Sequence, residues 1–302
     1  MKTLRILIKR NTKLFFKDKG LFFAALITPG ILLMLYATFL AGVYRDGFLS
    51  VIPEGMPVTA TVEALIDGCV GGQLVSSLLA VSCVTVAFCA NVLMVQDKVN
   101  GAARDLTVSP VKPSTLALGY YVATLVSTLT VCLTATAVCL FYVAGIGWYL
   151  SVADVLLLLL DVLLLVLFGT ALSSVLYFFL RSQGQISAVS TLVSSCYGFL
   201  CGAYMPISQF SPALQKVIAL LPGTYGTVLL RNHAMRGVFA AMEAEGLPAE
   251  LVAGMQDTVD FNLYFFGDRV SLPVMYAVLG GTVLLLVGLY ILLHTLRNRR
   301  GA

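Results

Sequence analysis

The sequence predicts an all-α membrane protein with six transmembrane helices. Hydrophobic residues make up 59% of the 302 residues and charged residues only 11%, whereas soluble domains have about 25% charged residues. The mean hydropathy is +0.94. Several apolar runs exceed the roughly 20 residues that a helix needs to cross a bilayer, and polar segments separate them. We therefore expect one domain, a transmembrane bundle over residues 1–302.

The first segment, residues 1–19, has basic side chains at four-residue spacing, at Arg5, Lys9, Lys13 and Lys17. Apolar residues occupy much of another face of the same predicted helix. Such a basic amphipathic helix is suited to lie in the membrane interface against anionic lipids. The alternative is a plain basic flank to the first span, as the positive-inside rule describes.

The apolar runs predict where the spans lie. They are expected at residues 21–44, 67–95, 114–145, 152–180, 186–204 and 272–296, with an external loop over 45–66. Residues 206–271 are more mixed and are punctuated by proline. Short helices are expected there at 212–221 and 227–242. We expect the first part of this external region to dip back into the edge of the membrane.

A polar segment, residues 96–113, joins the second and third spans. It reads QDKVNGAARDLTVSPVKP. Val99, Ala102, Ala103 and Leu106 fall at helical spacing and form a small apolar face, and Pro110 is expected to end that helix. A short amphipathic helix held between two span ends is suited to contact a soluble partner.

This segment resembles the coupling region of permease subunits of type-2 ATP-binding-cassette transporters. That family has an acidic–basic pair, then a glycine, a leucine, and Thr or Ser before Pro. The matching ATPase-coupling residues here are Asp97, Lys98, Gly101, Leu106, Ser109 and Pro110. The family often has acidic residues where Val99 and Arg104 stand, so the charge offered to the partner differs here.

The rest of the chain has the form of that family, with an interfacial helix, six spans and an external re-entrant region. Residues 221–225, LPGTY, match its Pro-x-Thr-Tyr-like motif, and Arg231 stands where the family often has a basic residue. Residues 237–269 look like an added external elaboration.

The resemblance implies the transmembrane subunit of an ATP-driven exporter, which forms half of a translocation pathway with a copy of itself or a related permease. It also implies a separate ATPase subunit that docks under residues 96–113 and binds the ATP, so that this chain has no cofactor of its own.

The basic residues predict the orientation in the plasma membrane. If the N-terminus is cytoplasmic, cytoplasmic segments contain 14 of the 19 Lys and Arg residues: Lys2, Arg5, Lys9, Arg10, Lys13, Lys17, Lys19, Lys98, Arg104, Lys112, Arg181, Arg297, Arg299 and Arg300. The positive-inside rule then places both termini and residues 96–113 in the cytoplasm. The net charge of +4 follows from this partition and indicates no nucleic-acid partner.

The sequence lacks the common motifs of enzyme active sites. It has no GxxxxGK[ST] for a nucleotide, no HExxH for zinc and no GxSxG, and its two histidines, His233 and His294, are far apart. The seven cysteines form no CxxC and are interpreted as small buried residues. Two other hypotheses are a polytopic membrane enzyme that acts on lipids, which would need a polar cluster near a span end, and a non-transporting sensor or assembly factor.

Asp161 interrupts the apolar run of the fourth span. It lies about 14 Å along the helix from the start of that span and therefore near mid-depth. An acidic side chain at this depth is costly unless it is paired or protonated. Asp161 is thus either a residue of the translocation pathway or a hydrogen-bonded packing residue. Asp154, two turns earlier, is expected to be interfacial.

Overall fold

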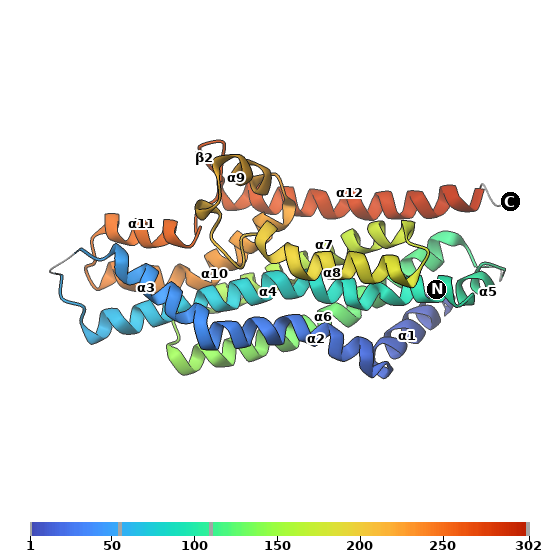
Figure 1. Ribbon diagram of the computed structural model, residues 1–302, viewed down its shortest axis with the longest axis horizontal. Coiled ribbons are helices and arrows are strands. Elements are labelled where there is room, and N and C mark those ends of the chain that lie inside the picture. The colour runs from blue at the N-terminus through green and yellow to red at the C-terminus, as the bar shows by residue number, and fades with distance from the viewer. Residues whose placement is uncertain (1, 54–55, 109–110, 300–302) are drawn as a thin grey trace.

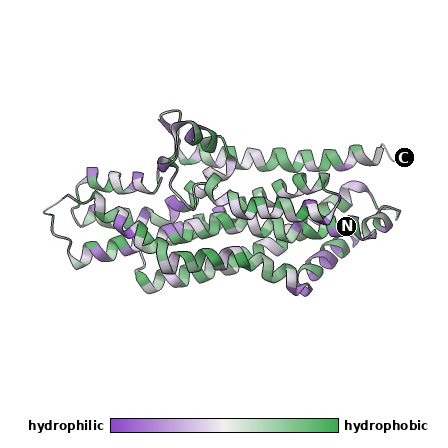
Figure 2. Cartoon of the chain, viewed as in Figure 1, coloured by the Kyte–Doolittle hydropathy of each residue, from purple (hydrophilic) through white to green (hydrophobic). Residues whose placement is uncertain are grey.

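The computed structural model describes residues 2–53, 56–108 and 111–299, which form a bundle of long helices along one axis (Figure 1). In these ranges the β-structure is one hairpin of two short strands. Hydrophobic residues dominate the long helices (Figure 2). Among the described residues, five helical stretches are long and apolar enough to cross a membrane, or six if one bent helix pair is counted as a span. The chain is therefore an all-α, multi-pass membrane protein, as predicted.

The chain begins with α1 (Lys2–Lys17), which packs along α6 (Pro113–Ile146). Asp18 starts α2 (Lys19–Leu35), because its carboxylate accepts a 3.1 Å hydrogen bond from the amide of Leu21. A π-helical stretch (Tyr36–Leu40) and α3 (Ala41–Val51) continue α2, so the first apolar helix runs over Lys19–Val51. It is longer than the predicted span at 21–44.

The predicted loop over residues 45–66 is wrong for most of its length. Helix α3 continues to Val51, and α4 (Ala60–Val99) already begins at Ala60. The Arg45 guanidinium lies 3.1 Å from the Asp67 carboxylate and 3.7 Å from that of Glu63. In the sequence these charged residues mark the end of the apolar run. In the structure they form ion pairs between α3 and α4, and both helices extend beyond the apolar run.

Helix α4 is the centre of the bundle. It is 40 residues long, and 89% of its most apolar stretch is buried. It packs against α2, α6, α7 (Val152–Phe179), α8 (Gln183–Leu200) and α10 (Pro222–Ala244). The predicted second span, 67–95, covers only its middle part. Hydropathy finds the apolar centre of such a helix, whereas hydrogen bonding sets its ends.

The third, fourth and last predicted spans correspond to α6, α7 and α12 (Leu272–Arg299) within a few residues. Pro113 starts α6, and Ser151 starts α7 in a capping box with Asp154. Helix α8 lies where the fifth span was predicted. It has 18 residues and is not one of the five stretches that are long and apolar enough to cross a membrane. It ends at Leu200, because the chain turns at Gly202, whose φ is 69°.

The region that follows α8 contains both helices expected from the sequence. Helix α9 (Pro212–Ala219) meets α10 at an angle of 87°. Helix α10 is longer than predicted and packs against α4, α7 and α12, so this part of the region belongs to the core. A 3₁₀ turn (Ile207–Gln209), α11 (Ala249–Thr258), β1 (Tyr264–Phe265) and β2 (Asp268–Arg269) complete it.

Close helix packing on α4 depends on small residues. A Cβ atom built on Gly169 of α7 would lie 2.8 Å from the Cys83 carbonyl oxygen and 2.9 Å from the Val84 Cα. We expect Gly169→Ala to lower the free energy of unfolding by about 1–3 kcal/mol, since backbone atoms must move apart. Thermal unfolding in detergent measures this.

Gly281→Ala is the matched control, because nothing lies within 4 Å of its added Cβ. Equal melting temperatures for the two variants would contradict the assigned α4–α7 packing.

Candidate functional site

The segment with the predicted coupling residues lies at the end of the bundle where both termini are found (Figure 1). Its first residues belong to α4, which continues through Val99. Gly101 then turns the chain with φ at 83°, a conformation that residues with a Cβ rarely adopt. The expected short helix follows as α5 (Ala102–Val108).

Asp97 is turned into the bundle and is only 6% exposed. Its carboxylate accepts hydrogen bonds of 2.7 and 3.1 Å from the Arg10 guanidinium of α1. It also accepts a 2.7 Å hydrogen bond from the Tyr120 hydroxyl of α6. The bond to Asp97 raises the pKa of Arg10 above its already high ordinary value. Asp97 thus joins α1, α4 and α6 near the end of the bundle.

Lys98 joins α4 to α7 in a similar way. Its Nζ donates hydrogen bonds of 2.9 and 3.1 Å to the carbonyl oxygens of Tyr177 and Phe178. These carbonyls lie in the last turn of α7, where the helix has a partial negative charge. The Lys98 Nζ also lies 5.6 Å from the centre of the Phe178 ring. Both charges of the acidic–basic pair are therefore engaged within the chain.

The remaining coupling residues lie on α5 or beside it. Leu106 is half-buried and packs against the core, while Asp105 and Val108 are exposed, Val108 at 83%. Ser109 and Pro110 lie outside the described residues. Helix α5 therefore combines an anchored leucine with an exposed face, and the Gly101 turn connects it to the anchored end of α4.

Asp161 is fully buried and has two protein partners. The Tyr276 hydroxyl of α12 donates a 2.6 Å hydrogen bond to one carboxylate oxygen, and the His233 Nδ1 of α10 lies 2.6 Å from the other. The carboxylate thus connects three helices. This geometry favours a hydrogen-bonded packing role for Asp161 over a role in the translocation pathway.

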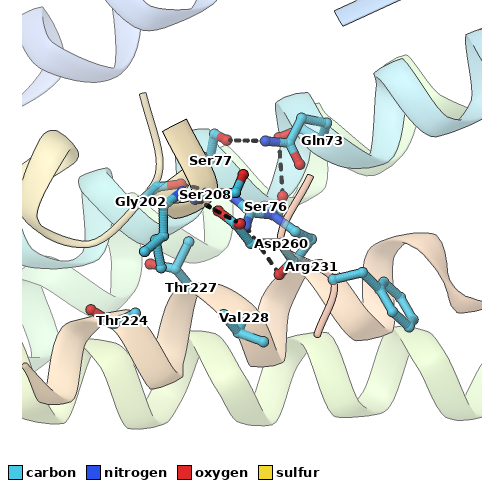
Figure 3. A network of polar contacts seen from close by, with 12 residues as sticks. Gln73, Ser76, Ser77, Gly202, Ser208, Thr224, Thr227, Val228, Arg231 and Asp260 are labelled. Atoms are coloured by element: carbon cyan, nitrogen blue, oxygen red, sulfur yellow. Dashed lines mark hydrogen bonds and ion pairs between the residues drawn. The ribbon is translucent and has the colours of Figure 1, made fainter. Parts of the chain in front are cut away.

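A second polar cluster lies between α4 and α10 (Figure 3). The fully buried Arg231 donates hydrogen bonds to the carbonyl oxygens of Gly202, at 2.8 Å, and Asp260, at 3.3 Å. The Asp260 carboxylate accepts from the amides of Ile207 and Ser208 and lies 3.8 Å from Arg231. Burial raises the pKa of Asp260, while Arg231 and the amides act in the opposite direction. This cluster holds the turn after α8 against α10.

Several partners of these acidic residues were not predicted from the sequence. Asp154, which was expected to be interfacial, is 2% exposed, and the Arg236 guanidinium donates a hydrogen bond to its carboxylate. His233 was set aside because the two histidines lie far apart in sequence. A buried acid in a span requires a polar partner. His233, in the predicted helix at 227–242, was therefore a candidate that this requirement could have identified.

A comparison with protein families gives a match. A family model described as ABC-2 type transporter matches residues 2–234. The match includes α1 to α9, the segment at 96–113 and the first half of α10, and it ends just before residues 237–269. The comparison with curated proteins gives no match.

The contacts of Asp161 predict different results for two substitutions. In Asp161→Asn the amide oxygen still accepts from Tyr276, and a change of His233 tautomer lets Nδ1 accept from the new amide group. We expect this variant to keep nearly the wild-type melting temperature. Asp161→Leu leaves buried polar groups without an acceptor, at a cost of about 1–3 kcal/mol for each group.

Thermal unfolding of both variants in detergent makes the comparison. Equal losses of stability in Asp161→Asn and Asp161→Leu would contradict the packing role and show that the negative charge itself is required.

Proposed function

The chain belongs to the ABC-2 type transporter family, and from this premise we propose that it is the membrane subunit of an ATP-driven exporter. One chain forms half of the translocation pathway and pairs with a copy of itself or a related permease. A separate ATP-binding-cassette subunit binds and hydrolyses the ATP. The match over residues 2–234 is the observation on which this proposal chiefly depends.

The proposed docking site for the ATPase is α5. It lies at the end of the bundle with both termini, which the charge distribution assigns to the cytoplasm of a plasma-membrane protein (Figure 1). Its exposed residues Asp105 and Val108 are available to a partner. Leu106 packs against the core and holds the helix on the bundle.

The proposed coupling runs from α5 through the Gly101 turn to the end of α4. Asp97 connects that end to α1 and α6 through Arg10 and Tyr120. Lys98 connects it to the last turn of α7. Displacement of α5 by the ATPase would therefore act on four helices at once. In this proposal the acidic–basic pair transmits the motion, and neighbouring residues contact the partner.

Two substitutions in this segment test the proposal. Gly101→Val places a β-branched residue at φ 83°, which costs about 1–3 kcal/mol and shifts α5. Leu106→Asp removes the apolar anchor of α5. We expect both variants to insert and fold but to lose ATPase binding and ATP-dependent transport, measured by co-purification and by flux in proteoliposomes.

Gly246→Val is the matched control for Gly101→Val. Gly246 follows the end of α10 with φ at 85° and, like Gly101, has no atom within 4 Å of an added Cβ. It lies at the opposite end of the bundle, beside α11 (Figure 1). Full transport in both Gly101→Val and Leu106→Asp, or equal loss in Gly246→Val, would contradict the coupling role of this segment.

A further inference from the structure

We propose that an apolar groove between α2, α4 and α6 binds one acyl chain of an anionic phospholipid. The phospholipid headgroup contacts lysines at the corner where α1 meets α2. This site concerns the attachment of the first two helices to the membrane and is separate from the proposed transport activity.

The groove has a volume of about 460 Å³, within the range of roughly 300–1,000 Å³ that is usual for ligand sites. Its walls are almost entirely apolar and include Phe22, Leu26 and Leu33 of α2, Leu78 of α4 and Val138 of α6. Leu26, Leu33 and Val138 are 38–56% exposed, so the groove opens on the outer surface of the bundle. In a membrane this surface faces lipid.

Two residues of α2 leave this space empty. Gly30 lines the groove, and nothing lies within 4 Å of a Cβ atom added to it. Pro29, the residue before it, also lines the groove and cannot donate a hydrogen bond within the helix. A larger side chain at position 30 would therefore project into the groove without a clash with the bundle.

The length of the groove fits a single acyl chain. From Phe22 to Leu33 is 11 residues along α2, or about 17 Å at 1.5 Å per residue. One leaflet provides about 15 Å, half of the roughly 30 Å hydrocarbon core. A lipid with its headgroup at the α1–α2 corner would therefore fill the groove with one chain.

The charge at this corner indicates the type of headgroup. Lys13, Lys17 and Lys19 are exposed and lie within three positions along the chain of Phe16 or Phe22, which line the groove. Hydrophilic residues gather at the corner, and hydrophobic ones follow along α2 (Figure 2). The one acidic residue in this part of the chain, Asp18, caps α2. Three lysines beside an apolar groove complement the phosphate of an anionic lipid.

The same charges argue against a second copy of the chain as the occupant. A twofold dimer uses the same surface patch on both subunits, and with its axis along the membrane normal the two patches face each other at the same depth. A dimer through this groove would bring the two lysine clusters together. Like charges in such an arrangement repel, whereas an anionic lipid neutralises them.

Photo-crosslinking in vesicles tests the proposal. The chain is reconstituted with phosphatidylglycerol that has a photoreactive group on its acyl chain, or with phosphatidylcholine labelled in the same way. Peptide mass spectrometry then locates the labelled residues. We expect phosphatidylglycerol to label the groove residues of α2 and α6 several-fold more than phosphatidylcholine does.

Two variants separate the parts of the proposed site. Gly30→Leu fills the groove, and the combined Lys13→Gln, Lys17→Gln and Lys19→Gln variant removes the charge but leaves the groove open. Each should reduce labelling several-fold. Gly42→Leu, another exposed position without neighbours in the same helical stretch, and the combined Lys2→Gln and Arg5→Gln variant at the far end of α1 should leave it unchanged.

Three results would overturn the proposal. Equal labelling by the two lipids would exclude recognition of an anionic headgroup. Undiminished labelling in Gly30→Leu would exclude the groove as the acyl-chain site. Crosslinks between α2 helices of two chains, in place of lipid adducts, would identify a second copy as the occupant.

Discussion

The structure depends on the burial of α4. Because neighbouring helices cover almost all of its central part, polar side chains on α4 are stabilised only by partners within the chain. Asn91 is an example: its amide nitrogen lies 3.1 Å from the hydroxyls of Ser173 and Ser174, and its oxygen accepts from Thr124. This requirement fixes how α6 and α7 are placed around α4.

The same requirement explains why the side chains of the charged pair at the end of α4 point into the bundle. Asp97 and Lys98 lie where apolar packing gives way to the polar segment at 96–113, and each finds partners on other helices. An exposed acidic–basic pair would contribute little to stability. Turned inward, the two side chains make the end of α4 a rigid junction of α1, α6 and α7. This is why we assign them to the transmission of motion.

Much of this architecture could be predicted from the sequence, because membrane thickness alone determines which apolar runs are long enough to span. This predicts the positions of α6, α7 and α12. The short helix α5 was predicted from apolar residues at helical spacing. The partners of the buried polar side chains could not be predicted in this way. Asp161 and His233 are separated by 72 positions, and no local pattern relates them. The loop predicted at 45–66 failed for a related reason, since Arg45 is paired on a helix rather than solvated in a loop.

We assign Asp97 to the transmission of motion and not to the binding of the ATPase. Transport by Asp97→Asn in proteoliposomes, titrated with increasing amounts of the ATPase subunit, tests this most directly. We expect a lower maximal flux at an unchanged half-saturating ATPase concentration, because docking on α5 survives while the junction is weakened. A wild-type maximal flux that is reached only at a higher ATPase concentration would contradict it and would place Asp97 in the docking surface.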